Sequence, residues 1–270
     1  PGLPLEWVYL VAMGLILCLI VRLIGVVFPR RRASLEVDKL CLSMFDALRK
    51  MQRSSALKHM EAKSLGAQLL LTHHPAIWDL KTVNDQTEQG RNLLYLIENG
   101  IAALNAHTNL DKAHGGVNDV LAQTLGLNGV RVASPEGIDA QGREYGLVRI
   151  GSIAPCRPER FAAFVKDALH CPGVRYVSGG REIRTVAVGG GACADALSEI
   201  AALGCDAFVT ADVKYNAFAD AAALGVTLVD AGHFETENPI CAVLAEKLRT
   251  AFPNLTVFVS ESHEDPIKFA

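Results

Sequence analysis

The stretch Leu69-Leu70-Leu71-Thr72-His73-His74-Pro75 decides how the rest of the chain is interpreted. Its unbroken apolar run is typical of a buried strand in a parallel sheet, and Pro75 ends the strand because it lacks a backbone N–H and has a fixed φ. Two imidazoles therefore stand at a sheet edge, where open α/β folds bind ligands. Imidazole is the commonest metal ligand, but ordinary polar residues at a strand end give the same pattern, so further ligands must decide.

Strand and helix patterns alternate from residue 39 to residue 259. Strand patterns cover residues 39–44, 69–72, 101–105, 144–153, 174–178, 185–188, 207–210, 226–230 and 255–259. Helical patterns cover residues 47–65, 87–98, 117–125, 158–169, 194–203, 215–224 and 239–252, and residues 134–142 have the composition of a loop. Strands separated by helices of this length predict an α/β fold of mainly parallel sheets that are covered by helices.

A repeated sequence pattern indicates two related halves of the chain. Residues 65–72 and 203–210 share the frame Leu-Gly-x-x, then three apolar residues, then Thr. We interpret them as parts of two similar βα halves that face each other across a metal-binding cleft, with lobes at about residues 33–130 and 131–270. The alternative is that junctions between a helix, a glycine and a strand commonly look alike.

The first 32 residues differ in composition from the α/β domain expected at residues 33–270. Residues 8–28 are almost wholly apolar apart from Arg22, and an arginine run follows at residues 30–32. This length matches the ~20 residues of a membrane-spanning helix with a positive cytoplasmic flank. An arginine inside the span is costly in lipid. Residues 1–32 are therefore either a membrane anchor or an atypical start of the chain.

The overall composition favours a cytoplasmic protein and argues against a nucleic-acid partner. The net charge is −3 and the basic residues are scattered apart from the run at 30–32, so no nucleic-acid partner is expected. The 7 cysteines form no C-x-x-C pair and are odd in number, which indicates neither a disulfide framework nor a zinc knuckle. We interpret them as reduced thiols that are mostly buried.

Histidines and carboxylates gather after several of the predicted strands. The clusters are His73-His74, His107 with Asp111, and His233 with Glu237. The last two pairs are four residues apart, a spacing that places both side chains on one face of a helical turn. The same spacing favours Glu237 over Glu235 as a ligand. Imidazoles and carboxylates suit zinc, iron or manganese, and a carboxylate can bridge two cations ~3.5–4 Å apart.

A glycine-rich loop follows the strand pattern at residues 185–188. Gly189, Gly190 and Gly191 precede a helical pattern, and N–H groups at the start of a helix can bind a phosphate or another anion of a substrate or cofactor. The loop lacks the spacing of G-x-G-x-x-G and the lysine of a P-loop, so a purely structural turn is the alternative.

In its motifs the chain resembles the NIF-three-like family, also called GTP cyclohydrolase I type 2. The resemblance covers about residues 37–260 and rests on His73-His74-Pro75, residues 107–111, residues 189–192, Asp212-Val213-Lys214-Tyr215 and residues 232–237. The chain departs from the family pattern after Glu6-Trp7, and it has Asn216 where the family often has His.

This resemblance implies a NIF-three-like fold, a toroidal homohexamer and two divalent cations in each chain. The implied ligands are His74 with Asp111 for one cation and His73 with His233 for the other, with Glu237 bridging both. His107 would stand beside the site as a candidate acid or base. The implied activity is metal-dependent hydrolysis of a small-molecule substrate such as a nucleotide, through a metal-activated water. The alternative is a metal-binding, metal-delivery or interaction protein without turnover.

Overall fold

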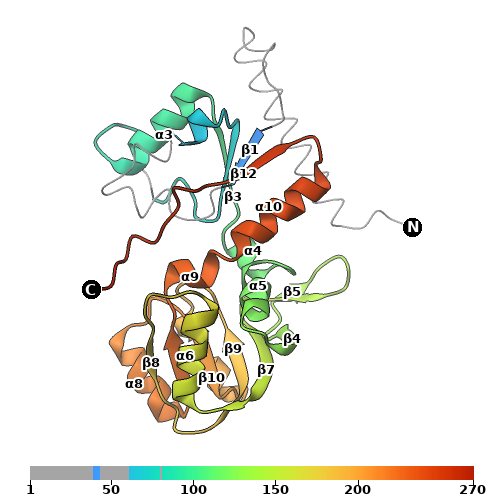
Figure 1. Cartoon of the computed structure of the whole chain (residues 1–270), viewed down its shortest axis with the longest axis vertical. Helices are drawn as coiled ribbons and strands as arrows, with labels where there is room; N and C mark the ends of the chain where they lie inside the picture. The colour runs from blue at the N-terminus through green and yellow to red at the C-terminus, as the bar shows by residue number, and fades with distance from the viewer. Residues whose placement is uncertain (1–38, 43–60, 80) are drawn as a thin grey trace.

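The computed structural model describes residues 39–42, 61–79 and 81–270, which form two lobes, each built around a sheet (Figure 1). The predicted α/β class is confirmed. Residues 8–28, the candidate membrane segment, lie outside the described residues. Among the helices of the described part, none combines the length and the apolar character that a membrane span requires.

The first lobe contains a parallel sheet in the order β12-β1-β2-β3. Its strands are β1 (Lys39–Leu42), β2 (Leu69–Thr72), β3 (Ala102–Asn105) and β12 (Thr256–Val259). The strand predicted before the two histidines is β2, an interior strand of this sheet. Because the chain returns from the second lobe to place β12 beside β1, a boundary near residue 130 does not divide it into two consecutive lobes, contrary to our expectation.

The second lobe contains a mixed sheet in the order β4-β7-β9-β10-β11-β8. Its strands are β4 (Asn128–Val132), β7 (Arg149–Cys156), β8 (Arg175–Val177), β9 (Ile183–Val188), β10 (Ala207–Thr210) and β11 (Thr227–Asp230), and a separate pair is formed by β5 (Gly137–Ile138) and β6 (Glu144–Tyr145). Strands β9, β10 and β11 are parallel, whereas β4, β7 and β8 join antiparallel. The expectation of mainly parallel sheets is thus wrong for the outer strands, because apolar periodicity carries no information on strand direction.

The helices follow the sequence patterns closely. They are α3 (Glu88–Asn99), α4 (Thr108–Lys112), α5 (Val117–Thr124), α6 (Pro158–Ala168), the 3-10 turn η2 (Ala194–Ala196), α7 (Leu197–Ala202), α8 (Tyr215–Leu224), α9 (His233–Glu237) and α10 (Ile240–Ala251). The end signals are visible in α3, where the Thr87 side chain accepts a hydrogen bond from the Gly90 N–H and Gly100 adopts a left-handed conformation. Most of the helix predicted at residues 47–65 lies outside the described residues.

Apolar side chains cover both faces of the second sheet. On one face it packs against Leu121 of α5 and Phe161 of α6, and on the other against Ile200 of α7 and Ala221 of α8, all fully buried. Burial of each large apolar side chain contributes roughly 1.5–3 kcal/mol, so these strands are held firmly. The loops after them consequently start from fixed positions.

The two segments that share the repeated sequence pattern, residues 65–72 and 203–210, form equivalent turns into a strand, one in each lobe. Gly66 and Gly204 have φ of 63° and 77°, a left-handed conformation that favours glycine, and they lead into β2 and β10. Helices α4 and α9, which carry candidate ligands, lie where the lobes meet (Figure 1). The fold therefore brings the loops after strands of both lobes to one region.

Candidate metal centre

Strand β2 delivers two imidazoles where it ends. The Thr72 hydroxyl donates a hydrogen bond to the His74 carbonyl at 2.7 Å, which holds the chain in a turn directly after the strand. His73 is fully buried, and its Nδ1 lies 2.7 Å from the carbonyl oxygen of Ala106. Because a carbonyl only accepts, the proton of neutral His73 resides on Nδ1, and Nε2 keeps its lone pair for a metal.

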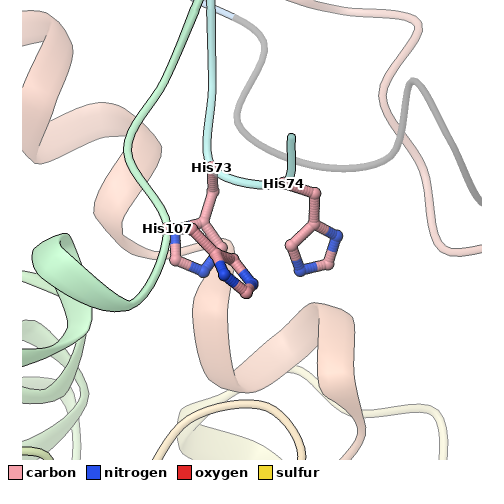
Figure 2. A group of neighbouring side chains, drawn as sticks. All are labelled: His73, His74 and His107. Carbon is pink, nitrogen blue, oxygen red and sulfur yellow. The ribbon is translucent and has the colours of Figure 1, made fainter. Parts of the chain in front are cut away.

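Strand β3 and helix α4 supply the next candidates. His107 is the N-cap residue of α4, and Asp111 is a buried residue one turn further along this helix. The ring of His107 lies 5.1 Å from that of His73 and 5.5 Å from that of His74, centroid to centroid. Figure 2 shows the three imidazoles reaching into the same space from two neighbouring strand ends.

Helix α9 supplies the last pair. His233 and Glu237 lie one turn apart, and Nε2 of His233 is 3.1 Å from Oε2 of Glu237, as their spacing predicted. The carboxylate of Glu235 is turned toward the start of its own helix, where a Cβ placed on Gly232 would lie 2.1 Å from Oε2 of Glu235. Glu237, and not Glu235, is therefore the carboxylate that faces His233.

The five predicted metal ligands meet around the carboxylate of Glu237. Oε1 of Glu237 lies 3.8 Å from Nε2 of His73, and Oε2 lies 3.4 Å from Nε2 of His74. Nε2 of His73 is 3.4 Å from Oδ1 of Asp111, and Nε2 of His74 is 3.3 Å from Nε2 of His233. Glu237 thus faces two groups of donors with its two oxygens.

The grouping of these donors differs from the one that the resemblance implied. His73 lies with Asp111 and His74 lies with His233, whereas the implied sets were His74 with Asp111 and His73 with His233. The reason is that successive residues at a strand end point to opposite sides. His73 therefore faces α4 and His74 faces α9.

Burial and mutual contact shift the pKa values of these groups in opposite directions. Burial, reinforced by the charge of Glu237, raises the pKa of Asp111 to about 8. Burial also favours neutral Glu237, but the imidazoles of His233 and His74 outweigh it and lower the pKa of Glu237 to about 2. Burial lowers the pKa of His73 to about 4. At neutral pH Glu237 is therefore an anion and His73 a neutral donor, the forms that bind a cation.

His233 behaves differently because a second carboxylate contacts it. Burial lowers its pKa, but the hydrogen bond to Asp212 and the contact with Glu237 outweigh burial and raise the pKa of His233 to about 9. A cation that binds Nε2 of His233 must therefore displace a proton at neutral pH.

The spacing, burial and chemistry of the donor atoms fit a metal ion. The ligand atoms of His73, His74 and His107 lie within 4.8 Å of one another, as do those of His74, His233 and Glu237. Oδ1 of Asp111 is buried and accepts no hydrogen bond from the part of the chain that the structure describes. A buried oxygen without a donor costs roughly 1–3 kcal/mol, which a bound cation would recover. Imidazole and carboxylate donors together suit zinc, iron or manganese.

The glycine-rich loop has a role other than the predicted anion site. The N–H groups of Gly189, Gly190 and Gly191 donate to the Val209 carbonyl, the Asn118 side chain and the Thr236 hydroxyl, at 3.0, 2.7 and 3.0 Å. All three predicted donors are thus engaged within the protein, which contradicts an anion site built from them.

The loop instead packs closely against the metal ligands. Gly191 has φ of 63°, and a Cβ placed on it would lie 2.1 Å from Oε1 of Glu237 and 3.1 Å from Nε2 of His233. Glycine is therefore required at this position both by the backbone conformation and by the space that Glu237 occupies.

Sequence analysis assigned no role to two residues at the site, Asp212 and Trp78. Asp212 follows β10 and binds Nδ1 of His233 at 2.8 Å. Trp78 is 58% exposed, and its ring stands 5.6 Å from that of His107 at an interplanar angle of 84°. A polar residue shortly after a buried strand is a usable signal for Asp212, because His74 has the same position, two residues after the end of β2. The sequence has no comparable signal for Trp78.

Comparison with known proteins identifies the family. A sequence model described as Duf34/NIF3 (NGG1p interacting factor 3) matches residues 56–266. The chain belongs to the Duf34/NIF3 family. The family resemblance drawn from the motifs is thereby confirmed, and the Duf34/NIF3 match contains all five predicted metal ligands.

Named relatives of this Duf34/NIF3 chain share most of its length. A GTP cyclohydrolase 1 type 2 homolog from Streptomyces coelicolor is 40% identical over 217 residues, which is 76% of this chain and 75% of the relative. A protein of the same name from Clostridium perfringens is 32% identical over 213 residues, 77% of this chain and 80% of the relative. A Helicobacter pylori protein named GTP cyclohydrolase 1 type 2 is 29% identical over 202 residues, 74% of this chain and 75% of the relative.

A solved structure supports the fold. The crystal structure of a Bacillus cereus protein related to NIF3 superimposes with a TM-score of 0.74 at 24% sequence identity, and the match covers 86% of this chain and 90% of that one. At this identity the likeness shows that the Duf34/NIF3 fold is shared.

Proposed function

We propose that this chain binds two divalent cations and acts as a metal-dependent hydrolase on a nucleotide-like substrate. The observation that carries the proposal is the position of Glu237, whose two oxygens face two groups of donors. One cation would be held by His73 and Asp111 and the other by His74 and His233. Glu237 would bridge both, as carboxylates do in two-metal sites.

The proposed chemistry assigns a proton acceptor to the chain itself. Divalent cations held by these ligands would supply Lewis-acid character and lower the pKa of water toward about 7. Burial and the neighbouring His74 lower the pKa of His107, so its imidazole is neutral at pH 7 and able to accept a proton. Nδ1 of His107 lies 3.3 Å from the Thr108 hydroxyl, which leaves Nε2 as the atom that we propose takes the proton.

The nucleotide-like substrate is supported by the names of the relatives. The Helicobacter pylori relative is called GTP cyclohydrolase 1 type 2, and several others are called its homologs. GTP is therefore the first substrate to test. Self-association as a toroidal homohexamer remains a prediction, and the mass of the purified protein in sedimentation equilibrium tests it.

A second candidate function is metal binding without turnover. His107 favours it, because its ligand atom lies within 4.8 Å of those of His73 and His74 and could bind a cation rather than a proton. A cation surrounded by protein ligands keeps no open position for a substrate, as in structural metal sites. Such a protein would store or deliver metal.

Elemental analysis combined with a GTP assay separates the two functions. The wild-type protein should hold about two cations per chain and consume GTP, and Glu237→Ala should lose most of both. Glu235→Ala is the matched control, because its carboxylate lies two residues away on the same helix and is directed at Gly232. GTP loss no faster in wild type than in Glu237→Ala would refute the hydrolase on GTP.

The variant His107→Ala tests the role of this histidine. If His107 is the proton acceptor, the variant keeps its cations and loses turnover, by roughly 10²–10⁴-fold for general base catalysis. If His107 is a ligand, the variant loses metal, which would favour the second function. Equal turnover in variant and wild type would remove His107 from the mechanism.

A further inference from the structure

Asp212 contacts the far side of a candidate metal ligand. Its Oδ2 lies 2.8 Å from Nδ1 of His233, while Nε2 of the same ring faces Glu237 and His74. An ionised carboxylate only accepts hydrogen bonds, so the proton of this contact belongs to Nδ1 of His233. The lone pair of a neutral His233 is then on Nε2, the nitrogen that faces the site.

The backbone of Asp212 is held in an uncommon conformation by its neighbours. Its φ is 52°, in the left-handed region that residues other than glycine rarely adopt. The Ala211 N–H donates to the Gly191 carbonyl at 2.9 Å, and the Val213 N–H donates to Oδ2 of Asp230 at 3.1 Å. Because hydrogen bonds fix the residues on both sides, the carboxylate of Asp212 is directed at His233 by the fold rather than by its own preference.

Asp230 links the segment of Asp212 to the segment of His233. Its Oδ2 accepts from the Val213 N–H, and its Oδ1 accepts from the Gly232 N–H at 3.2 Å. Arg175 pairs with the same Asp230 carboxylate and also donates to the Val213 carbonyl at 3.0 Å. One buried carboxylate therefore sets the separation between the two loops that bring Asp212 and His233 together.

We propose that Asp212 is a positioning residue that fixes the ring orientation and the Nδ1–H tautomer of His233, and thereby strengthens cation binding at the His74–His233 half of the centre. Histidine ligands of metals commonly donate their other N–H to a carboxylate or carbonyl, which orients the ring and increases its basicity. His73 has the neutral Ala106 carbonyl in this place, so the two halves of the centre differ in the charge behind the ligand. The inference rests on the proposed cation binding and is independent of turnover.

The test uses zinc as the probe and two substitutions at Asp212. Asp212→Gly removes the carboxylate at a position whose left-handed backbone glycine adopts freely, so the loop keeps its path. Asp212→Asn keeps an oxygen that can accept from Nδ1–H but removes the charge. Asp79→Gly is the matched control, because Asp79 is an exposed aspartate with the same φ of 52°.

Zinc titration of the full chain gives the first measurement. Loss of a hydrogen-bonding partner behind a histidine ligand weakens metal affinity by about 10–100-fold. We expect Asp212→Gly to weaken one of the two zinc sites by this factor, Asp212→Asn to weaken it less, and Asp79→Gly to bind as the wild type does. Thermal unfolding of the metal-free variants checks that Asp212→Gly is folded.

Nuclear magnetic resonance of the zinc-loaded protein with ¹⁵N-labelled histidine gives a second measurement that a merely structural role would not change. The wild type should show the Nδ1–H proton of His233 protected from exchange with water, and Asp212→Gly should lose this protection. If Asp212→Gly binds zinc as tightly as Asp79→Gly and keeps the protected proton, the positioning role is refuted while the metal centre stands. If the wild type itself binds no zinc, the proposed metal centre fails and the positioning role fails with it.

Discussion

Replacement of Gly191 by alanine tests the packing of the glycine-rich loop against the metal ligands. In the present structure the new Cβ would lie 2.1 Å from Oε1 of Glu237 and 3.1 Å from Nε2 of His233. The first distance is far below any contact that real Cβ atoms make, so either the loop or the Glu237 side chain must move. We expect Glu237 to move, because the loop is tied by hydrogen bonds from Gly190 and Gly191.

The magnitude follows from two contributions. A left-handed conformation costs a residue with a Cβ roughly 1–2 kcal/mol relative to glycine, and Gly191 has φ of 63°. Displacement of Glu237 from its imidazole partners removes charged contacts that are worth roughly 1.5–3 kcal/mol. The free energy of unfolding of the metal-free Gly191→Ala protein should therefore fall by roughly 2.5–5 kcal/mol.

A second glycine separates these contributions. Gly126 has φ of 62°, and a Cβ placed on it meets nothing within 4 Å. Gly126→Ala should thus lose only the backbone contribution, roughly 1–2 kcal/mol. Urea unfolding measures both variants, and elemental analysis counts their metal. We expect Gly126→Ala to keep its cations and Gly191→Ala to bind them at least about 10-fold more weakly, since the carboxylate proposed to bridge them is displaced.

Equal behaviour of the two alanine variants would refute close packing of Gly191 against Glu237. If Gly191→Ala unfolds at the same urea concentration as Gly126→Ala and holds the same amount of metal, then Gly191 does not pack against the ligands as described.

Two further predictions concern protonation and a buried ion pair. Loading the metal-free protein at pH 7 should release about two protons, one each from Asp111 and His233, whose pKa values are raised to about 8 and about 9. The apparent metal affinity should therefore increase as the pH rises from 7 to 9. Calorimetry in buffers of different ionisation enthalpy measures the number of protons released, and a finding of no release would contradict this prediction. Arg149, 1% exposed, pairs with Asp119 and donates to the Lys112 carbonyl, so Arg149→Met should lower the free energy of unfolding by roughly 3 kcal/mol. The exposed Arg143 is the control in urea unfolding, with less than about 1 kcal/mol expected for Arg143→Met, and equal losses would refute the structural role of Arg149.

Local signals in the sequence determined most of the helices and strands, and they singled out the candidate ligands. The apolar run before His73 predicted β2, and the helical pattern at residues 87–98 predicted α3. The four-residue spacing of His233 and Glu237 predicted their contact on one face of α9. Each of these signals depends on residues within one or two helical turns, where backbone geometry alone fixes which side chains meet.

Only the tertiary structure decided how these parts combine. Strand direction in the second sheet, the return of β12 to the first sheet and the pairing of His74 with His233, 159 residues apart, depend on how the lobes pack. The same holds for Gly191, whose lack of a side chain matters because Glu237 occupies the space beside it, and for Asp212, whose direction is set by hydrogen bonds to its neighbours. The physical reason is that contacts between distant segments arise from packing and loop geometry, which leave no periodic trace in the sequence.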